Sequence, residues 1–108
     1  MKSMLVAAAA ALWMAAACPM TLAGDADANA ILIKGFMFSP MDTTIKAGTR
    51  VTWTNQDEEP HSIASNEGLF RSGALDTGES YSFKFDKPGT YHYVCTIHPR
   101  MVATITVQ

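Results

Sequence analysis

Alternating apolar and polar residues in the second half of the chain predict short β-strands. In ESYSFKFD, the aromatic residues Tyr81, Phe83 and Phe85 fall on one side of an extended backbone. The same period of two continues in TYHYVC and in MVATITVQ, which ends the chain. A KPG segment separates the first two runs and is typical of a turn.

The first half of the domain shows the same kind of pattern. TTIKAGTRVTWTN divides at its AG turn and places Val51 and Trp53 on one face. ILIKGFMF is largely apolar, and Gly35 interrupts its alternation in the way that a β-bulge does. Residues 55–77 are less regular, so we expect one strand near His61 with loops on either side. Because no segment downstream of the Ala-rich start has a helical period, we predict an all-β sandwich or small barrel.

The N-terminal segment follows neither pattern. Lys2 is the only charged residue before Asp25, and the stretch between them is rich in Ala. A basic start, an apolar run and small residues near its end predict a secretory signal peptide, residues 1–23, and export to the periplasm. We expect residues 24–30 to be a flexible leader and residues 31–108 to form the folded domain.

This segment has two alternative interpretations. It is long enough to be an uncleaved membrane anchor, but Pro19 and the low hydrophobicity of Ala argue against a bilayer span. A lipoprotein signal would be acylated at Cys18, but MAAAC lacks the leucine that such signals usually carry three residues earlier. We therefore expect no stable membrane association.

Charge and cysteine content narrow the function classes. Without residues 1–23 the chain keeps seven Lys or Arg against ten Asp or Glu, a net charge of −3. It has no basic patch, so we expect no nucleic-acid partner. Cys18 leaves with the signal peptide, so Cys95 is a single free thiol and no internal disulfide can form. A free thiol is a liability in an oxidising compartment, so its retention suggests a specific role such as metal binding. A bound metal would also stabilise a small domain.

Three potential metal ligands lie close together in YVCTIHPRM. Cys95, His98 and Met101 are spaced C-x2-H-x2-M on the loop between the last two predicted strands. Of the other two histidines, His92 points to the opposite face of its strand from Cys95. His61, in EEPHS, is the remaining candidate for a fourth ligand, brought near by strand pairing.

This ligand set favours copper. Two imidazoles, a thiolate and a weak thioether are the donors of blue-copper electron-transfer sites. Zinc would be expected with more cysteines or histidines and no methionine. A metal whose positions are all filled by protein offers no obvious place for a substrate, so we expect electron transfer rather than catalysis.

VTWTNQDEEPHSI and GTYHYVCTIHPRM together resemble the cupredoxin family, and within it the amicyanins. The resemblance covers nearly all of residues 31–108. It implies a Greek-key β-sandwich of seven to eight strands that holds one type 1 copper near one end. It also implies His61, Cys95, His98 and Met101 as the ligands, with the edge of His98 as the electron port.

The chain departs from the amicyanin pattern at three positions. Ser62 stands where an asparagine usually joins the two ligand loops, and it can make a shorter, weaker version of that bond. Ile97 replaces a proline, and Arg100 adds a positive charge where an apolar residue is common. We expect Asn55 and Ser62 to orient the ligands through hydrogen bonds.

We expect a non-enzymatic carrier of single electrons, which acts as a monomer as small carriers usually do. Its donor would be a redox enzyme such as a dehydrogenase and its acceptor a cytochrome c, each docking transiently around His98. One alternative is a copper-binding protein for delivery or storage. Another is an enzyme with Cys95 as nucleophile and His61 as base, but the short chain and Met101 argue against it.

Two other groups of residues are expected to have less specific roles. The acidic run of Asp57, Glu58 and Glu59 is predicted to be a solvated loop, or a surface that steers a basic partner. Met37 and Met41 are expected to pack at a sheet edge rather than to transfer copper.

Overall fold

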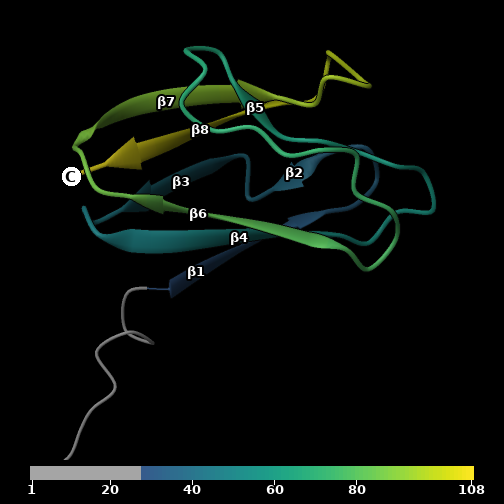
Figure 1. Ribbon diagram of the computed structural model, residues 1–108, viewed down its shortest axis with the longest axis horizontal. Helices are drawn as coiled ribbons and strands as arrows, with labels where there is room; N and C mark the ends of the chain where they lie inside the picture. The colour runs from purple at the N-terminus through teal and green to yellow at the C-terminus, as the bar shows by residue number, and fades with distance from the viewer. Residues whose placement is uncertain (1–27) are drawn as a thin grey trace, which may run out of the picture.

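The computed structural model describes residues 28–108, which form two four-stranded sheets packed face to face (Figure 1). The strands are β1 (Ala28–Ile33), β2 (Phe38–Ser39), β3 (Asp42–Ile45), β4 (Thr49–Asn55), β5 (Ala64–Ser65), β6 (Ser80–Phe85), β7 (Gly89–Val94) and β8 (Val102–Val107). One sheet has the order β2-β1-β4-β6 and the other the order β3-β8-β7-β5. The predicted all-β sandwich of seven to eight strands is confirmed. Residues 28–108 contain no helix that is long and apolar enough to span a membrane.

The domain begins earlier than the sequence pattern indicates. β1 starts at Ala28 and runs parallel to β4, with Ala28 opposite Arg50 and Ile33 opposite Asn55. The residues before Ile31 are small and polar, which is why the sequence predicts them to be part of a flexible leader. Their backbone groups nevertheless extend the ladder with β4, so strand pairing places the boundary within the predicted leader. The predicted signal peptide lies outside the described residues.

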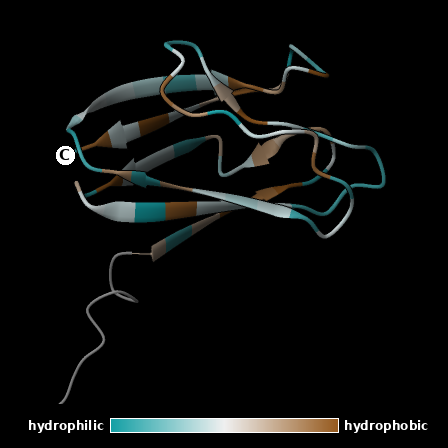
Figure 2. Cartoon of the chain, viewed as in Figure 1, coloured by the Kyte–Doolittle hydropathy of each residue, from teal (hydrophilic) through white to brown (hydrophobic). Residues whose placement is uncertain are grey.

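The interior is built from the alternating residues of both sheets. Val51, Trp53 and Phe85 of one sheet and Ile105 and Tyr93 of the other are almost fully buried. Figure 2 shows hydrophobic segments on strands of both layers. The Trp53 ring contacts four other aromatic rings, those of Phe70, Tyr81, Phe85 and Tyr93. Tyr81, Phe83 and Tyr91 are partly buried and pack against this core.

Gly35 lies in a tight turn, where a bulge was expected. Two backbone hydrogen bonds between Lys34 and Met37 close the turn between β1 and β2. Gly35 and Phe36 have φ angles of 65° and 59°. A two-residue type I′ turn requires a positive φ angle at both of these central positions. The apolar run continues through the turn, so the sequence pattern alone does not separate the two strands.

The loops that carry the candidate ligands meet at one end of the sandwich. Figure 1 shows the β7–β8 loop and the segment between β4 and β5 at the end away from the C-terminus. β7 and β8 pair up to Val94 and Val102, which fixes the two ends of the loop between them. His61 pairs with Leu75 in an isolated bridge beyond the last residue of β4. The sheets thus position two segments that are distant in sequence.

We expect truncation of a core residue in β1 to destabilise the fold strongly. Ile33→Ala should lower the free energy of unfolding by about 3 kcal/mol, because it leaves a cavity in a packed core. The neighbouring Leu32 is 39% exposed on the opposite face. Leu32→Ala should therefore cost about 1 kcal/mol or less. Urea unfolding of the two variants measures the difference, and equal losses would contradict the assigned faces of β1.

Candidate metal centre

Three of the four predicted ligands come together around one point. The donor atoms of His61, Cys95 and His98 all lie within 4.8 Å of one another. The Cys95 Sγ atom is 3.8 Å from Nδ1 of His61 and 3.9 Å from Nδ1 of His98. Met101, the fourth, is buried in the same loop and lines a surface hollow together with His98. Two nitrogens thus face a single sulfur.

The loop from Cys95 to Met101 is closed by its own backbone. The Cys95 N–H donates to the Met101 carbonyl at 3.0 Å, and the Met101 N–H donates to the His98 carbonyl at 2.9 Å. Cys95 immediately follows β7, and Met101 immediately precedes β8. The C-x2-H-x2-M spacing therefore fits a compact turn between two paired strands.

Ser62 joins the two ligand loops. Its backbone N–H donates to Cys95 Sγ at 3.3 Å. Its hydroxyl accepts a hydrogen bond from the Thr96 N–H at 2.9 Å and lies 2.6 Å from the Thr96 hydroxyl. These bonds hold the residue after His61 against the residue after Cys95. They are consistent with the predicted bridging role of Ser62.

Asn55 supports the His61 loop without touching the other ligands. Its side-chain amide donates to the carbonyls of Glu59 and Leu75 at 2.9 and 2.8 Å. Its side-chain oxygen accepts from the Asp57 N–H at 2.9 Å. Because Leu75 also pairs with His61 through the backbone, Asn55 helps to fix the position of His61.

Asp57 is a site residue that the sequence interpretation placed in a solvated loop. Its side chain is only 12% exposed, and one carboxylate oxygen lies 2.9 Å from Nε2 of His61. Partial burial opposes ionisation, but hydrogen bonds from Phe36, Gly35 and His61 outweigh it and hold the pKa of this carboxyl below its ordinary value. The i, i+4 spacing from Asp57 to His61 is the only signal in the sequence that indicates the contact.

Phe36 is a second site residue that the sequence does not predict. Its ring lies edge-on to both candidate histidines, with centroid separations of 5.1 Å from His61 and 4.9 Å from His98. In contrast, His92 lies on the outer face of β7, where its Nδ1 atom is 3.1 Å from the Thr104 hydroxyl. This placement agrees with the expectation that His92 is not a ligand.

The site has one partly exposed edge. His61 and Cys95 are fully buried and Met101 is nearly so, whereas His98 is partly exposed. The hollow beside His98 has a volume of about 430 Å³ and is lined by Phe36, Ile97, His98, Pro99, Arg100 and Met101. Of the four candidate ligands, only His98 therefore offers a substantial part of its side chain to a partner.

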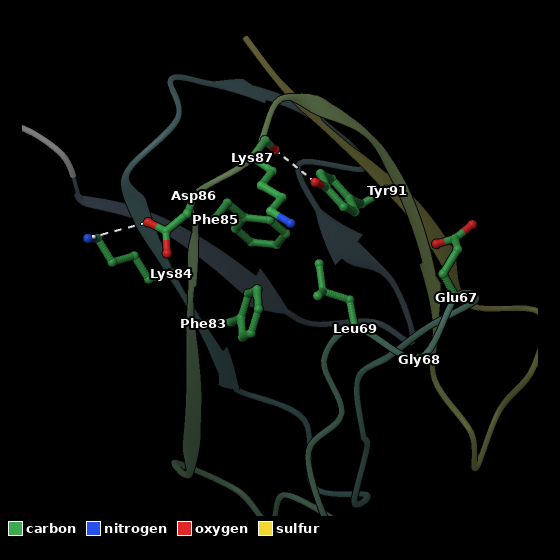
Figure 3. Close-up of a pocket in the computed structure, with 9 residues that line it drawn as sticks. All are labelled: Glu67, Gly68, Leu69, Phe83, Lys84, Phe85, Asp86, Lys87 and Tyr91. Atoms are coloured by element: carbon green, nitrogen blue, oxygen red, sulfur yellow. Dashed lines mark hydrogen bonds and ion pairs between the residues drawn. The ribbon is translucent and has the colours of Figure 1, made fainter.

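A larger surface hollow lies elsewhere. It has a volume of about 570 Å³ and includes Phe83, Phe85 and Tyr91 in its lining, but none of the four candidate ligands. Figure 3 shows these rings with Leu69 around the hollow. This hollow is therefore separate from the candidate metal centre.

A family model for a cupredoxin-like domain matches residues 4–107. The chain belongs to the cupredoxin family. This cupredoxin is 35% identical to amicyanin-alpha of Methylorubrum extorquens over 88 residues, or 77% of the chain and 74% of the relative. It is 42% identical to plastocyanin of Scenedesmus fuscus over 102 residues, or 82% of the chain and 99% of the relative. A purple cupredoxin from Nitrosopumilus maritimus has a similar structure, with a TM-score of 0.68 and 36% identity over 73% of this chain and 98% of that one.

The residues present fit the copper cofactor of this family. Asp57 engages Nε2 of His61, which leaves Nδ1 free on the side that faces Cys95. Two such nitrogens, a buried thiol and a buried thioether are a soft donor set suited to copper. The cofactor of this cupredoxin is one type 1 copper ion.

We expect loss of the Ser62 hydroxyl to weaken the link between the ligand loops. Ser62→Ala leaves the Thr96 N–H without its partner and should lower the free energy of unfolding of the metal-free protein by about 1–3 kcal/mol. Ser82 and Thr52 form a hydroxyl pair of the same 2.6 Å length at an exposed position. Ser82→Ala is thus the matched control and should cost about 0.5 kcal/mol or less. Equal losses in urea unfolding would show that the loops are held together by other contacts.

Proposed function

We propose that this cupredoxin is a periplasmic carrier of single electrons, with His61, Cys95, His98 and Met101 as its copper ligands. One observation carries the proposal: three donor atoms converge within 4.8 Å, and only the outermost residue, His98, has a partly exposed side chain. A buried centre with one accessible edge allows an electron to pass while substrates are excluded. Copper supplies one-electron redox chemistry when it is bound.

The surrounding residues keep the donor atoms in place. The Ser62 N–H stabilises negative charge on the Cys95 sulfur. The closed backbone of the Cys95–Met101 loop and the bridge between His61 and Leu75 limit how far the ligands can move. A site that changes shape little between oxidation states has a low reorganisation cost, which favours rapid electron transfer.

The surface around His98 is suited to transient docking. Phe36 and Ile97 are each 43% exposed beside it, and Arg100 adds one positive charge. A small apolar surface with few charges supports weak and short-lived complexes. We infer a redox enzyme, such as a dehydrogenase, as donor and a cytochrome c as acceptor, with the carrier acting as a monomer.

Copper delivery or storage is the second candidate function. The observation that favours it is the exposure of Met37 and Met41, whose side chains are 52% and 45% accessible although both were expected to pack at a sheet edge. Exposed thioethers can bind Cu(I) during its transfer.

The spectrum of the copper-loaded protein tests the proposed function. Addition of Cu(II) should produce an intense blue thiolate-to-copper band with narrow hyperfine splitting in EPR. Cys95→Ser should abolish the band, because the thiolate that produces it is lost. His98→Ala should alter the spectrum, whereas His92→Ala should not, because His92 lies on the outer face of β7. A pale tetragonal spectrum of the unmodified protein would contradict the assignment as an electron carrier.

Copper release separates the carrier from the delivery protein. If the protein carries electrons, a Cu(I) chelator should remove copper slowly, and Met37→Leu/Met41→Leu should leave the rate unchanged within about twofold, since surface changes away from the site have small effects. A delivery protein should lose copper readily and should lose it more slowly in this double variant. The rate is measured from the absorbance of the chelator complex.

A further inference from the structure

One carboxylate connects His61 to a turn in a different part of the chain. The Asp57 oxygens accept hydrogen bonds from the Gly35 N–H at 2.7 Å and the Phe36 N–H at 2.9 Å. One of them also lies 2.9 Å from Nε2 of His61. Asp57 is itself held, because its N–H donates to Asn55 and its carbonyl accepts from the Thr77 hydroxyl at 2.6 Å. Three partners therefore converge on a carboxylate of fixed position.

The turn held by Asp57 has an unfavourable backbone conformation. Phe36 is the only non-glycine residue with a positive φ angle among residues 28–108. Such a conformation is sterically costly for a residue with a bulky side chain. Two hydrogen bonds to a charged acceptor offset that cost, since charge-assisted bonds are stronger than neutral ones. The Asp57 carboxylate thus adds to the two backbone hydrogen bonds between Lys34 and Met37 that close the turn.

The conformation of the turn directs the Phe36 ring over the metal centre. The ring meets His61 and His98 edge-on at 5.1 and 4.9 Å, although it is 43% exposed. A ring above both imidazoles restricts their tilting and limits the access of water to them. Asp57 thus acts on His61 directly and on His98 through Phe36.

We propose that Asp57 is the positioning residue of the copper centre, because its carboxylate fixes the His61 ring and holds Phe36 over both histidines. The proposal rests on the proposed function, in which these histidines are copper ligands. Asp57 orients the Nε2–H of His61 and so presents Nδ1 to the metal, as outer partners of metal-bound histidines do.

Asp57→Asn and Glu58→Gln form a matched pair of variants. Each removes one negative charge from the same loop, but Glu58 is exposed, and no side-chain hydrogen bond is observed for it among the described residues. Asp57→Asn should weaken copper binding by about tenfold or more, the usual effect of losing such a partner. It should also raise the reduction potential by more than Glu58→Gln does, because the lost charge lies beside a ligand and favoured Cu(II). Equal shifts in the two variants would overturn the proposal.

A double-variant cycle tests whether Asp57 acts through Phe36. Phe36→Leu should speed the removal of copper by a Cu(I) chelator, and Asp57→Asn should speed it more. The double variant should be no more than about twofold faster than Asp57→Asn alone, because coupled residues do not have additive effects. If the two effects instead multiply, Phe36 is not held in place by Asp57 and the proposal fails.

Measurements on the metal-free protein separate this proposal from the proposed function. The amides of Gly35 and Phe36 should exchange slowly with solvent in the unmodified protein and faster in Asp57→Asn, and slow exchange in both would overturn the proposal. This result does not depend on whether copper gives a blue site. If Asp57→Asn fails to fold, Asp57→Glu retains the carboxylate and should restore most of the copper affinity. Affinity as low in Asp57→Glu as in a carboxylate-free Asp57→Ser variant would count against the proposal.

Discussion

The sulfur of Cys95 has to be buried, hydrogen-bonded and close to two imidazoles at the same time. Within residues 28–108, where Cys95 is a free thiol, this requirement is met by closing one loop on its own backbone and packing a second loop against it. The Ser62 N–H reaches the sulfur across 33 residues of sequence. A thiol with such a donor can carry negative charge in an apolar interior, where an unsupported thiolate would be costly.

Much of the fold and of the proposed ligand set could be predicted from local sequence. Strand faces depend on a period of two, so alternation alone could place Tyr81, Phe83 and Phe85 on the face toward the core, although only Phe85 is fully buried. Three of the proposed ligand residues lie within seven positions, where a loop between paired strands must bring them close. His61 could be selected because the chain has only three histidines, and the strand face excludes His92.

Asp57 and Phe36 could not be predicted in the same way, because their contact depends on strand register. β1 runs parallel to β4 with Ile33 opposite Asn55, and the Gln56 N–H donates to the Ile33 carbonyl at 2.8 Å. With this register, the turn after Ile33 lies beside the residues that follow β4, so the backbone of Gly35 and Phe36 contacts Asp57. A shift of one residue would move every side chain of β1 to the other face and place a different residue beside Asp57. From the sequence alone, the acidic run is therefore predicted to be a solvated loop, and only the pairing of β1 with β4 shows otherwise for Asp57.

The inward orientation of Asp57 also changes the charge of the docking surface. Of the three acidic residues before His61, Glu58 and Glu59 face solvent, whereas the carboxylate of Asp57 is compensated by three donors. The electrostatic attraction for a basic partner is correspondingly weaker than the sequence indicates. Arg100 adds charge of the opposite sign near His98. Apolar contact around His98, where Phe36 and Ile97 are exposed, therefore contributes more to the proposed docking than long-range steering does.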